Sequence, residues 1–224
     1  MSRTVLVVAA HTDDEALGCG GTIAKHVAQG DNVYAVFLAD GVTSRPDASE
    51  QELSKRNAAA TSAHKILGIK QSFMLGFPDN RMDTVPLLDI VQELERVVDD
   101  VQPQIVYTHH YGDLNIDHRT THQAALTACR PVPGSSVREI YAFEVLSATE
   151  WNTPGVNSFS PNVFVDISDY IRTKMESLAA YKLEMRQEPH SRSLANVRRV
   201  AEFRGSSVGV EAAEAFCLVR SLSY

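Results

Sequence analysis

Residues 5–10 (VLVVAA) run directly into residues 11–15 (HTDDE), and this junction decides how the chain folds. The first six residues are continuously apolar and half of them are β-branched, which predicts a strand buried on both faces. Strands of that kind are typical of parallel sheets. A glycine cluster follows at residues 18–21, and we expect a helix from about Thr22 to a stop at Gly30.

The rest of the chain alternates strand-like runs with segments of helical spacing. Strands are expected at residues 32–39, 72–77, 104–108, 137–143, 163–167 and 215–219. Helices are expected at residues 50–67, 86–98, 117–129, 170–186 and 194–203. This alternation predicts an α/β, Rossmann-like fold, with a mostly parallel sheet and helices on both of its faces. Because no repeat or linker interrupts it, we predict one domain over residues 1–224.

The composition narrows the classes of partner and compartment. The chain has 224 residues, 44% of them hydrophobic, and a net charge of −7. Such a surface does not attract phosphate backbones, so no nucleic acid partner is expected. The apolar stretches are too short for a signal peptide or a membrane span. The three cysteines, Cys19, Cys129 and Cys217, form no disulfide framework, which favours a reduced, cytoplasmic location.

Two polar clusters follow strands whose carboxyl ends lie at one edge of the predicted sheet. His11, Asp13 and Asp14 follow the first strand, and Asp117 and His118 come after residues 104–108. Ligands bind at this edge in open parallel sheets. Imidazole and carboxylate groups suit a catalytic zinc ion, which keeps three protein ligands and a fourth position for water. A neighbouring carboxylate that is not a ligand can take a proton from that water.

Other interpretations of the same residues stay open at this point. Acidic residues after a strand often form a solvated loop or cap a helix, and Asp117 is an ordinary N-cap residue. Residues 18–21 could instead approach a phosphate in a Rossmann-type nucleotide-binding protein, although the GxGxxG spacing is incomplete. Judged from the residues alone, a metal hydrolase and these alternatives are equally supported.

The two clusters also resemble a known family. Residues 10–21 (AHTDDEALGCGG) are similar to the Ala-His-Pro-Asp-Asp-Glu motif and glycine-rich helix start of the PIG-L/LmbE superfamily of zinc-dependent N-deacetylases. Residues 115–118 (NIDH) resemble its second motif, which ends in Asp-His at a helix start. Smaller similarities occur around Arg56, at residues 76–80 (GFPDN) and at residues 213–216 (AEAF).

The resemblance implies a role for each matching residue. His11, Asp14 and His118 would be the ligands of one Zn²⁺ ion, with Asp13 as the general base and Asp117 beside the ligands. Arg56 and Asp79 match positions that face the substrate, although a helix arginine is more often solvated or ion-paired, and Asp79 suits a turn. The implied substrate is a small N-acyl amino sugar or related glycoconjugate, and the implied assembly is a homo-oligomer. Another divalent metal can fill such a site.

The sequence departs from the family pattern at two positions. Thr12 replaces the usual proline, a change that removes no ligand, and we expect little effect on function. Asn115 replaces a histidine that assists catalysis in many members. Its amide can donate a hydrogen bond to an oxyanion but cannot carry protons, so Asp13 is expected to make both proton transfers. A relative that kept the metal but lost catalysis is a further alternative, against which the retained Asp13 argues weakly.

The remaining histidines receive simpler interpretations. His109 and His110 follow a strand at the same edge, and we interpret them as loop histidines, with the helper role as their alternative. His122 shares the helix face of His118 and is expected beside the ligands or in the core. His190 lies in a polar loop that could cover the site, whereas His26 and His64 are expected on helix surfaces. Specificity is expected in the loops at residues 42–49 and 149–161.

Overall fold

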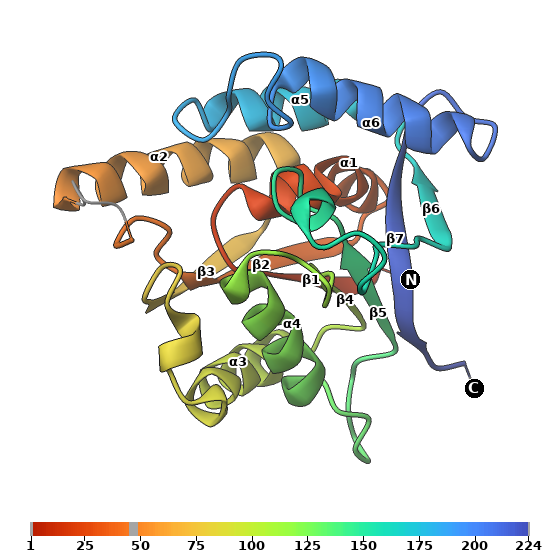
Figure 1. Cartoon of the computed structure of the whole chain (residues 1–224). Helices are drawn as coiled ribbons and strands as arrows, with labels where there is room; N and C mark the ends of the chain where they lie inside the picture. Colours follow the sequence, from red (N-terminus) through yellow and green to blue (C-terminus); the bar gives the residue numbers. More distant parts are fainter. Residues whose placement is uncertain (1, 45–48, 224) are drawn as a thin grey trace.

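β1 (Thr4–Ala9) runs through the middle of a seven-stranded sheet in this computed structural model, which describes residues 2–44 and 49–223 (Figure 1). The strand order is β3-β2-β1-β4-β5-β7-β6. β1 to β5 pair in parallel, whereas β7 is antiparallel to both β5 and β6, so the predicted mostly parallel sheet is confirmed. The other strands are β2 (Asn32–Ala39), β3 (Gln71–Phe77), β4 (Ile105–His109), β5 (Glu139–Phe143), β6 (Val163–Asp166) and β7 (Ala213–Ser221).

Helices cover both faces of the sheet (Figure 1). The side chains of β1 alternate between the two layers. Val5 and Val7 pack in the core on the side of α1, α2, α5 and α6, and Leu6 and Val8 pack toward α3 and α4. β1 is therefore apolar throughout because neither of its faces meets water. The helices are α1 (Asp14–Ala28), α2 (Glu50–Leu67), α3 (Leu87–Val101), α4 (Ile116–Ala128), α5 (Ile171–Ala180) and α6 (Leu194–Ser206), with 3₁₀ turns η1 (Met82–Thr84) and η2 (Thr149–Trp151).

The strand order reverses at β1, and this reversal creates the crevice in which a site can form. The chain leaves β1 through α1 to β2 on one side, whereas β4 pairs with the other side of β1. The segments that follow β1 and β4 consequently diverge from the same edge. In open α/β sheets this topological switch point is where ligands bind. Both polar clusters predicted from the sequence lie there.

The first helix corrects one expectation. α1 begins at Asp14, and the glycines expected to precede the helix lie inside it. A Cβ atom on Gly18 would overlap the ring of Phe143, and one on Gly21 would overlap Ile167. Glycine is a poor helix former, but only glycine allows α1 to pack this closely against its neighbours. The glycine cluster is thus a packing surface, which leaves no open loop for the phosphate cradle considered above.

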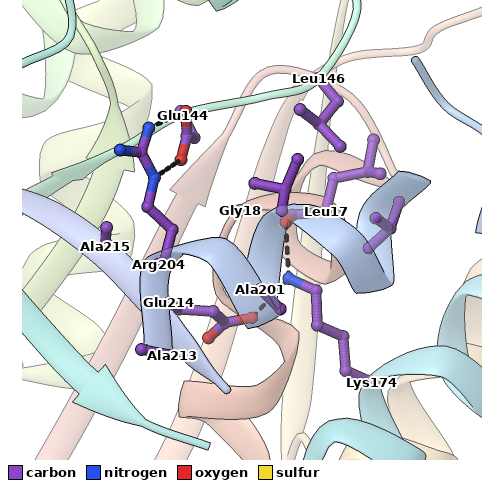
Figure 2. Close-up of a pocket in the computed structure, with 12 residues that line it drawn as sticks. Leu17, Gly18, Glu144, Leu146, Lys174, Ala201, Arg204, Ala213, Glu214 and Ala215 are labelled. Atoms are coloured by element: carbon purple, nitrogen blue, oxygen red, sulfur yellow. Dashed lines mark hydrogen bonds and ion pairs between the residues drawn. The ribbon is translucent and has the colours of Figure 1, made fainter. Parts of the chain in front are cut away.

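A buried ion pair supports the kink in α1. The helix departs from helical geometry at Cys19, and Glu214 of β7 accepts hydrogen bonds from the backbone N–H groups of Gly21 (2.9 Å) and Thr22 (2.7 Å). Lys174 of α5 pairs with Glu214 and donates to the carbonyl oxygen of Leu17 at 2.7 Å (Figure 2). From β7, Glu214 thus caps the part of α1 that follows the kink.

The other expected elements are present, with shifted ends. α5 ends at Ala180 and not near residue 186, and the chain then turns so that Tyr181 and Glu184 are buried. α6 extends to Ser206, and β7 begins at Ala213. Within the described residues, no helix has both the length and the apolar character needed to cross a membrane. The predicted loop at residues 42–49 is only partly covered, because residues 45–48 lie outside the described residues.

Candidate metal centre and active site

A tight turn after β1 brings His11 and Asp14 together. Asp13 has a φ of 121°, an uncommon conformation for a residue with a side chain, and α1 starts at the next residue. The backbone N–H of His11 donates to Asp14 Oδ2 at 2.9 Å, and His11 Nδ1 lies 3.3 Å from the same oxygen. The carboxylate of Asp14 is fully buried. The turn therefore directs an imidazole and a carboxylate toward one point.

The first turn of α4 supplies a second imidazole at this point. Asn115 is the N-cap of α4, and its Oδ1 accepts a hydrogen bond from the backbone N–H of Asp117 at 2.8 Å. His118 follows, with its Nε2 lying 3.4 Å from Asp14 Oδ2. Its Nδ1 lies 3.2 Å from Asp113 Oδ2, a buried carboxylate between β4 and α4.

His11, Asp14 and His118 fit a divalent metal ion. One ligand atom from each of the three lies within 4.8 Å of the others. Asp14 Oδ1 and His118 Nε2 are buried with no hydrogen-bond partner among the described residues. Buried polar atoms are nearly always partnered, so these unsatisfied atoms indicate that a ligand is shared between them. Two imidazoles and one carboxylate match the donor set of catalytic zinc sites.

A second acidic group surrounds the other nitrogen of His11. Its Nε2 lies 3.0 Å from Asp117 Oδ2 and 3.1 Å from Asp79 Oδ1, and the three residues also lie close enough to hold an ion. Here the carboxylates have protein donors: Asp117 accepts from the backbone N–H groups of Asn80 (2.6 Å) and Met82 (3.1 Å). Asp117 and Asp79 thus have the geometry of carboxylates that orient a metal-binding histidine through its second nitrogen.

The charges of the site are strongly coupled in the protein without metal. Burial alone would lower the pKa of His118, but the carboxylates of Asp14 and Asp113 raise it to about 9. Burial alone would raise the pKa of Asp14, but His118 and His109 hold it well below its usual range. The cluster therefore stores protons on its histidines beside an ionised Asp14. A metal ion must displace those protons to bind.

Asp13 lies beside this cluster and is held by two arginines. Its Oδ1 accepts from Arg56 Nη2 at 3.2 Å, and its Oδ2 accepts from Arg192 Nη1 at 2.9 Å. Burial raises the pKa of Asp13 to about 6, against the opposing effect of Arg192 and Arg56. A carboxylate with a pKa in this range is ionised at neutral pH and still basic enough to accept a proton usefully.

Arg56 reaches the site from α2 and is buried, so it is not a solvated surface residue. Its Nε donates to Thr12 Oγ1 at 2.9 Å, and its Nη1 pairs with Glu184 at 2.8 Å. The hydroxyl of Thr12 thereby makes a contact that proline could not make. Arg56 consequently locks the turn that carries Asp13.

The candidate site opens into a polar cavity of about 140 Å³. Asp79, which follows β3, hydrogen-bonds through its Oδ2 to the hydroxyl of Ser44. Burial would raise the pKa of Asp79, but hydrogen bonds from His11 and Ser44 lower it to about 2. The Nδ2 of Asn115 donates to Asn80 Oδ1 at 3.2 Å. The lining of the cavity includes His11, Asp13, Arg56, Asp79, Asn115 and Arg192.

Comparison with known proteins decides the family. The sequence model described as "PIG-L: GlcNAc-PI de-N-acetylase" matches residues 6–129, more than half of the chain and the part that carries both motifs. The chain belongs to the PIG-L family. A protein of Escherichia coli (strain K12) described as "uncharacterized deacetylase YaiS" is 32% identical, over 80% of this chain and 91% of that protein. The diacetylchitobiose deacetylase of Thermococcus kodakarensis (strain ATCC BAA-918 / JCM 12380 / KOD1) is 25% identical, over 95% of this chain and 81% of that protein.

Solved structures show the same fold at lower identity. The N,N'-diacetylchitobiose deacetylase of Pyrococcus horikoshii superposes with a TM-score of 0.80 at 22% identity, covering 98% of this chain and 84% of that one. GalB of Pseudomonas putida KT2440, a 4-carboxy-2-hydroxymuconate hydratase, superposes with a TM-score of 0.76 at 23% identity, covering 99% and 98%. The PIG-L fold is thus shared by a hydratase, so the fold alone does not determine the reaction.

The structure corrects several expectations for the histidines of this PIG-L protein. His109 is the last residue of β4 and not a loop residue, and its buried Nε2 accepts from the N–H of Ala10 at 2.9 Å. Its ring stacks on His118 with centroids 4.0 Å apart, while burial and the nearby charge of His118 keep its pKa well below normal. His26 and His64 are also buried, not on helix surfaces.

The two loop histidines are not in either candidate metal group of the described residues. His110 is buried, and its Nε2 lies 2.8 Å from the carbonyl oxygen of Asn157. The Nδ1 of His190 accepts from the backbone N–H of Arg192 at 3.0 Å, and its ring packs against Trp151. In the polar loop that carries His190, the residue that reaches Asp13 is Arg192.

Sequence reasoning missed three residues that shape the site, Asp113, Glu184 and Arg192, and it placed the buried His109 in a loop. Asp113 could have been found, because it lies five positions before His118 in the same polar segment. Arg192 contacts Asp13 across 179 positions. No local pattern marks such a contact, since it depends on how α5 ends and how the following loop returns to the sheet edge.

Proposed function

We propose that this protein is a metal-dependent hydrolase that removes an N-acetyl, or other N-acyl, group from an amino sugar or a related glycoconjugate. In this proposal His11, Asp14 and His118 hold one Zn²⁺ ion and Asp13 is the general base. The observation that carries it is the convergence of two imidazoles and a carboxylate, with unsatisfied buried ligand atoms, next to a second carboxylate that is not part of the group.

The metal would supply the electrophilic part of the chemistry. When bound, it polarises the acyl carbonyl group and makes a water molecule more acidic. A His₂Asp donor set accepts several divalent ions, so zinc is proposed from the donor types and the family. Asp117 and Asp79 would orient His11 through its Nε2, and Asp113 would do the same for His118 through its Nδ1.

The residues of the chain would move the protons. Asp13 takes a proton from the attacking water, for which its pKa of about 6 suits it. The same Asp13 then returns the proton to the departing amine nitrogen. Asn115 has one amide N–H left after its bond to Asn80, and it would use this N–H to contact the substrate or the oxyanion.

The substrate class follows from the cavity and from the family. The cavity is lined almost wholly by charged and amide side chains, which suits a polyhydroxylated ligand better than an apolar one. Arg56 and Asp79 lie in this lining and are proposed to face the substrate. Asp79 would contact the sugar, and Arg56 would shape the substrate pocket by holding Thr12 and Asp13 in place. The known deacetylases of the family support an N-acetylglucosamine-type substrate.

One experiment tests the proposal against its alternatives. The purified protein is analysed for metal, and amine release is then measured from a panel of N-acetylated sugars with and without a chelator. We expect a metal ion in a 1:1 ratio and chelator-sensitive amine release. A protein with metal and no amine release on the panel would point to a non-catalytic relative. A protein without metal that binds a dinucleotide would contradict the proposal entirely.

A further inference from the structure

The two arginines that hold Asp13 differ in their remaining contacts. Arg56 is 7% exposed, and every nitrogen of its guanidinium has a protein partner. Besides Asp13, these partners are Thr12 and Glu184. The guanidinium of Arg56 therefore has no nitrogen without a protein partner among the described residues.

Arg192 is held in place but not saturated. Its Nε donates to Ser147 Oγ at 2.6 Å and to the carbonyl oxygen of Leu146 at 3.1 Å, while Nη1 donates to Asp13. Its Nη2 has no hydrogen-bond partner among residues 2–44 and 49–223. The side chain is 19% exposed and lines the cavity. Because the other nitrogens fix the planar guanidinium, this free donor has a defined direction.

The charge around Arg192 makes its free donor important. The ionisable residues that line the same cavity include the carboxyl groups of Asp13, Asp79 and Glu184. A negative charge that develops in this cavity is repelled by these groups. Because each guanidinium nitrogen of Arg56 already has a partner, Arg192 is, among the described residues that line the cavity, the arginine with an unpartnered nitrogen for such a charge.

We propose that Arg192 is a further catalytic residue, which donates from Nη2 to the acyl oxygen as that oxygen becomes negatively charged. This proposal rests on the amide hydrolysis proposed above. As the oxygen of water bonds to the acyl carbon, the proton of water passes to Asp13 and the carbonyl electron pair moves onto the acyl oxygen. As that pair returns, the carbon–nitrogen bond breaks and the amine nitrogen takes the proton from Asp13.

The ion pair between Arg192 and Asp13 makes the positive charge of Arg192 available in the step that needs it. Before water attacks, the positive charge of Arg192 is balanced by the Asp13 carboxylate. Protonation of Asp13 removes that balance in the same step in which the acyl oxygen becomes negative. The guanidinium then interacts most strongly with the oxyanion, so it stabilises the transition state more than the bound substrate.

Turnover of Arg192 variants is the first test. Arg192→Ala should lower kcat by about 10²- to 10³-fold, as expected for the loss of an oxyanion donor, with a much smaller change in KM. Arg192→Lys should fall between wild type and Arg192→Ala, and added guanidinium should restore part of the activity of Arg192→Ala. Arg199→Ala is the matched control, because Arg199 lies on α6 and pairs with exposed Glu188; its kcat should equal that of wild type.

Acetate binding tests the same contact without turnover. Acetate carries the charge that Arg192 should recognise, and its affinity can be measured by ligand-observed NMR. Arg192→Ala should weaken acetate by about tenfold or more, both alone and in an Asp13→Asn background. Unchanged acetate affinity in both backgrounds would overturn the direct contact. In that case Arg192 would only position Asp13.

The two proposals fail in different ways. If wild-type protein releases no amine, the proposed hydrolase function fails. If wild type is active and Arg192→Ala is equally active, the hydrolase function stands and the role of Arg192 is wrong.

Discussion

Two buried clusters of charged residues contact α1, one at its first residue, Asp14, and one at the kink near Cys19, and they differ in how completely hydrogen bonds satisfy them. Around Glu214, the carboxylate accepts from Gly21, Thr22 and Lys174, and Lys174 also donates to Leu17. Neither side chain has an unsatisfied buried atom. Around Asp14, two candidate ligand atoms, Asp14 Oδ1 and His118 Nε2, are buried without a hydrogen-bond partner among the described residues.

A structural ion pair and a binding site differ here in whether their buried polar atoms have hydrogen-bond partners within the protein. A buried charge is tolerated when its partners saturate it, as Glu214 shows. A buried cluster left unsatisfied implies a missing partner or a considerable loss of stability. Burial and charge alone would not distinguish the two clusters, since both contain buried acidic and basic groups.

The largest effect should come from removing a proposed metal ligand. His118→Ala takes one imidazole from the group of three, so stoichiometric metal should be lost and amine release should fall to the protein-free background. Metal analysis and an amine assay check this. His26→Gln is the control, because His26 contacts Asp31 and Tyr107 away from the site. Full metal occupancy in His118→Ala would remove His118 from the ligand set.

Removing the proposed base should separate chemistry from metal binding. Asp13→Asn keeps the shape of the side chain but cannot accept a proton, so kcat should fall by about 10²- to 10⁴-fold with metal retained. The exposed Asp100→Asn serves as the charge-matched control, and its kcat should not change. Near-wild-type turnover of metal-loaded Asp13→Asn would show that another group is the base.

The Glu214 cluster should respond in stability and not in metal binding. Lys174→Met leaves Glu214 buried without its cation, so the free energy of unfolding in urea should fall by about 3–5 kcal/mol. Metal content of the folded protein should stay at the wild-type level. Adding Glu214→Gln should recover part of the loss. If Lys174→Met instead lost the metal and kept its stability, the division between the two clusters would be mistaken.

A smaller effect should appear in the pH dependence of metal affinity. The pKa of His118 in the metal-free protein is raised to about 9, so His118 is protonated at neutral pH and must lose its proton to bind metal. Apparent affinity should rise by about tenfold per pH unit for each proton displaced, up to about pH 9. Competition with a chromogenic chelator measures this. A pH-independent affinity between pH 6 and 8 would argue against His118 as a ligand.

In the metal-free protein, rising pH lowers the stability of the fold, whereas it raises the affinity for metal. Because the pKa of His118 is raised on folding, its protonation stabilises the fold fully below its unfolded value of about 6.5. That contribution is lost as the pH rises through about 9. Metal-free protein should therefore lose stability over the range in which metal affinity increases.

The sequence predicts the frame of the site better than its details. Strand direction and two motifs are enough to place His11, Asp14 and His118 at one sheet edge, because parallel strands share their carboxyl ends. The start of α1 was misjudged because glycine propensity is local, whereas the packing of Gly18 on Phe143 is not. The contact of Arg192 with Asp13 was missed for the same reason.

The central claim is that one divalent metal ion binds between His11, Asp14 and His118. Anomalous diffraction from crystals of zinc-loaded protein, collected on both sides of the zinc absorption edge, tests it most directly. We predict a single edge-dependent peak within bonding distance of His11 Nδ1, Asp14 and His118 Nε2. A peak at the neighbouring His11, Asp79 and Asp117 group, or no peak in this crevice, would contradict the account.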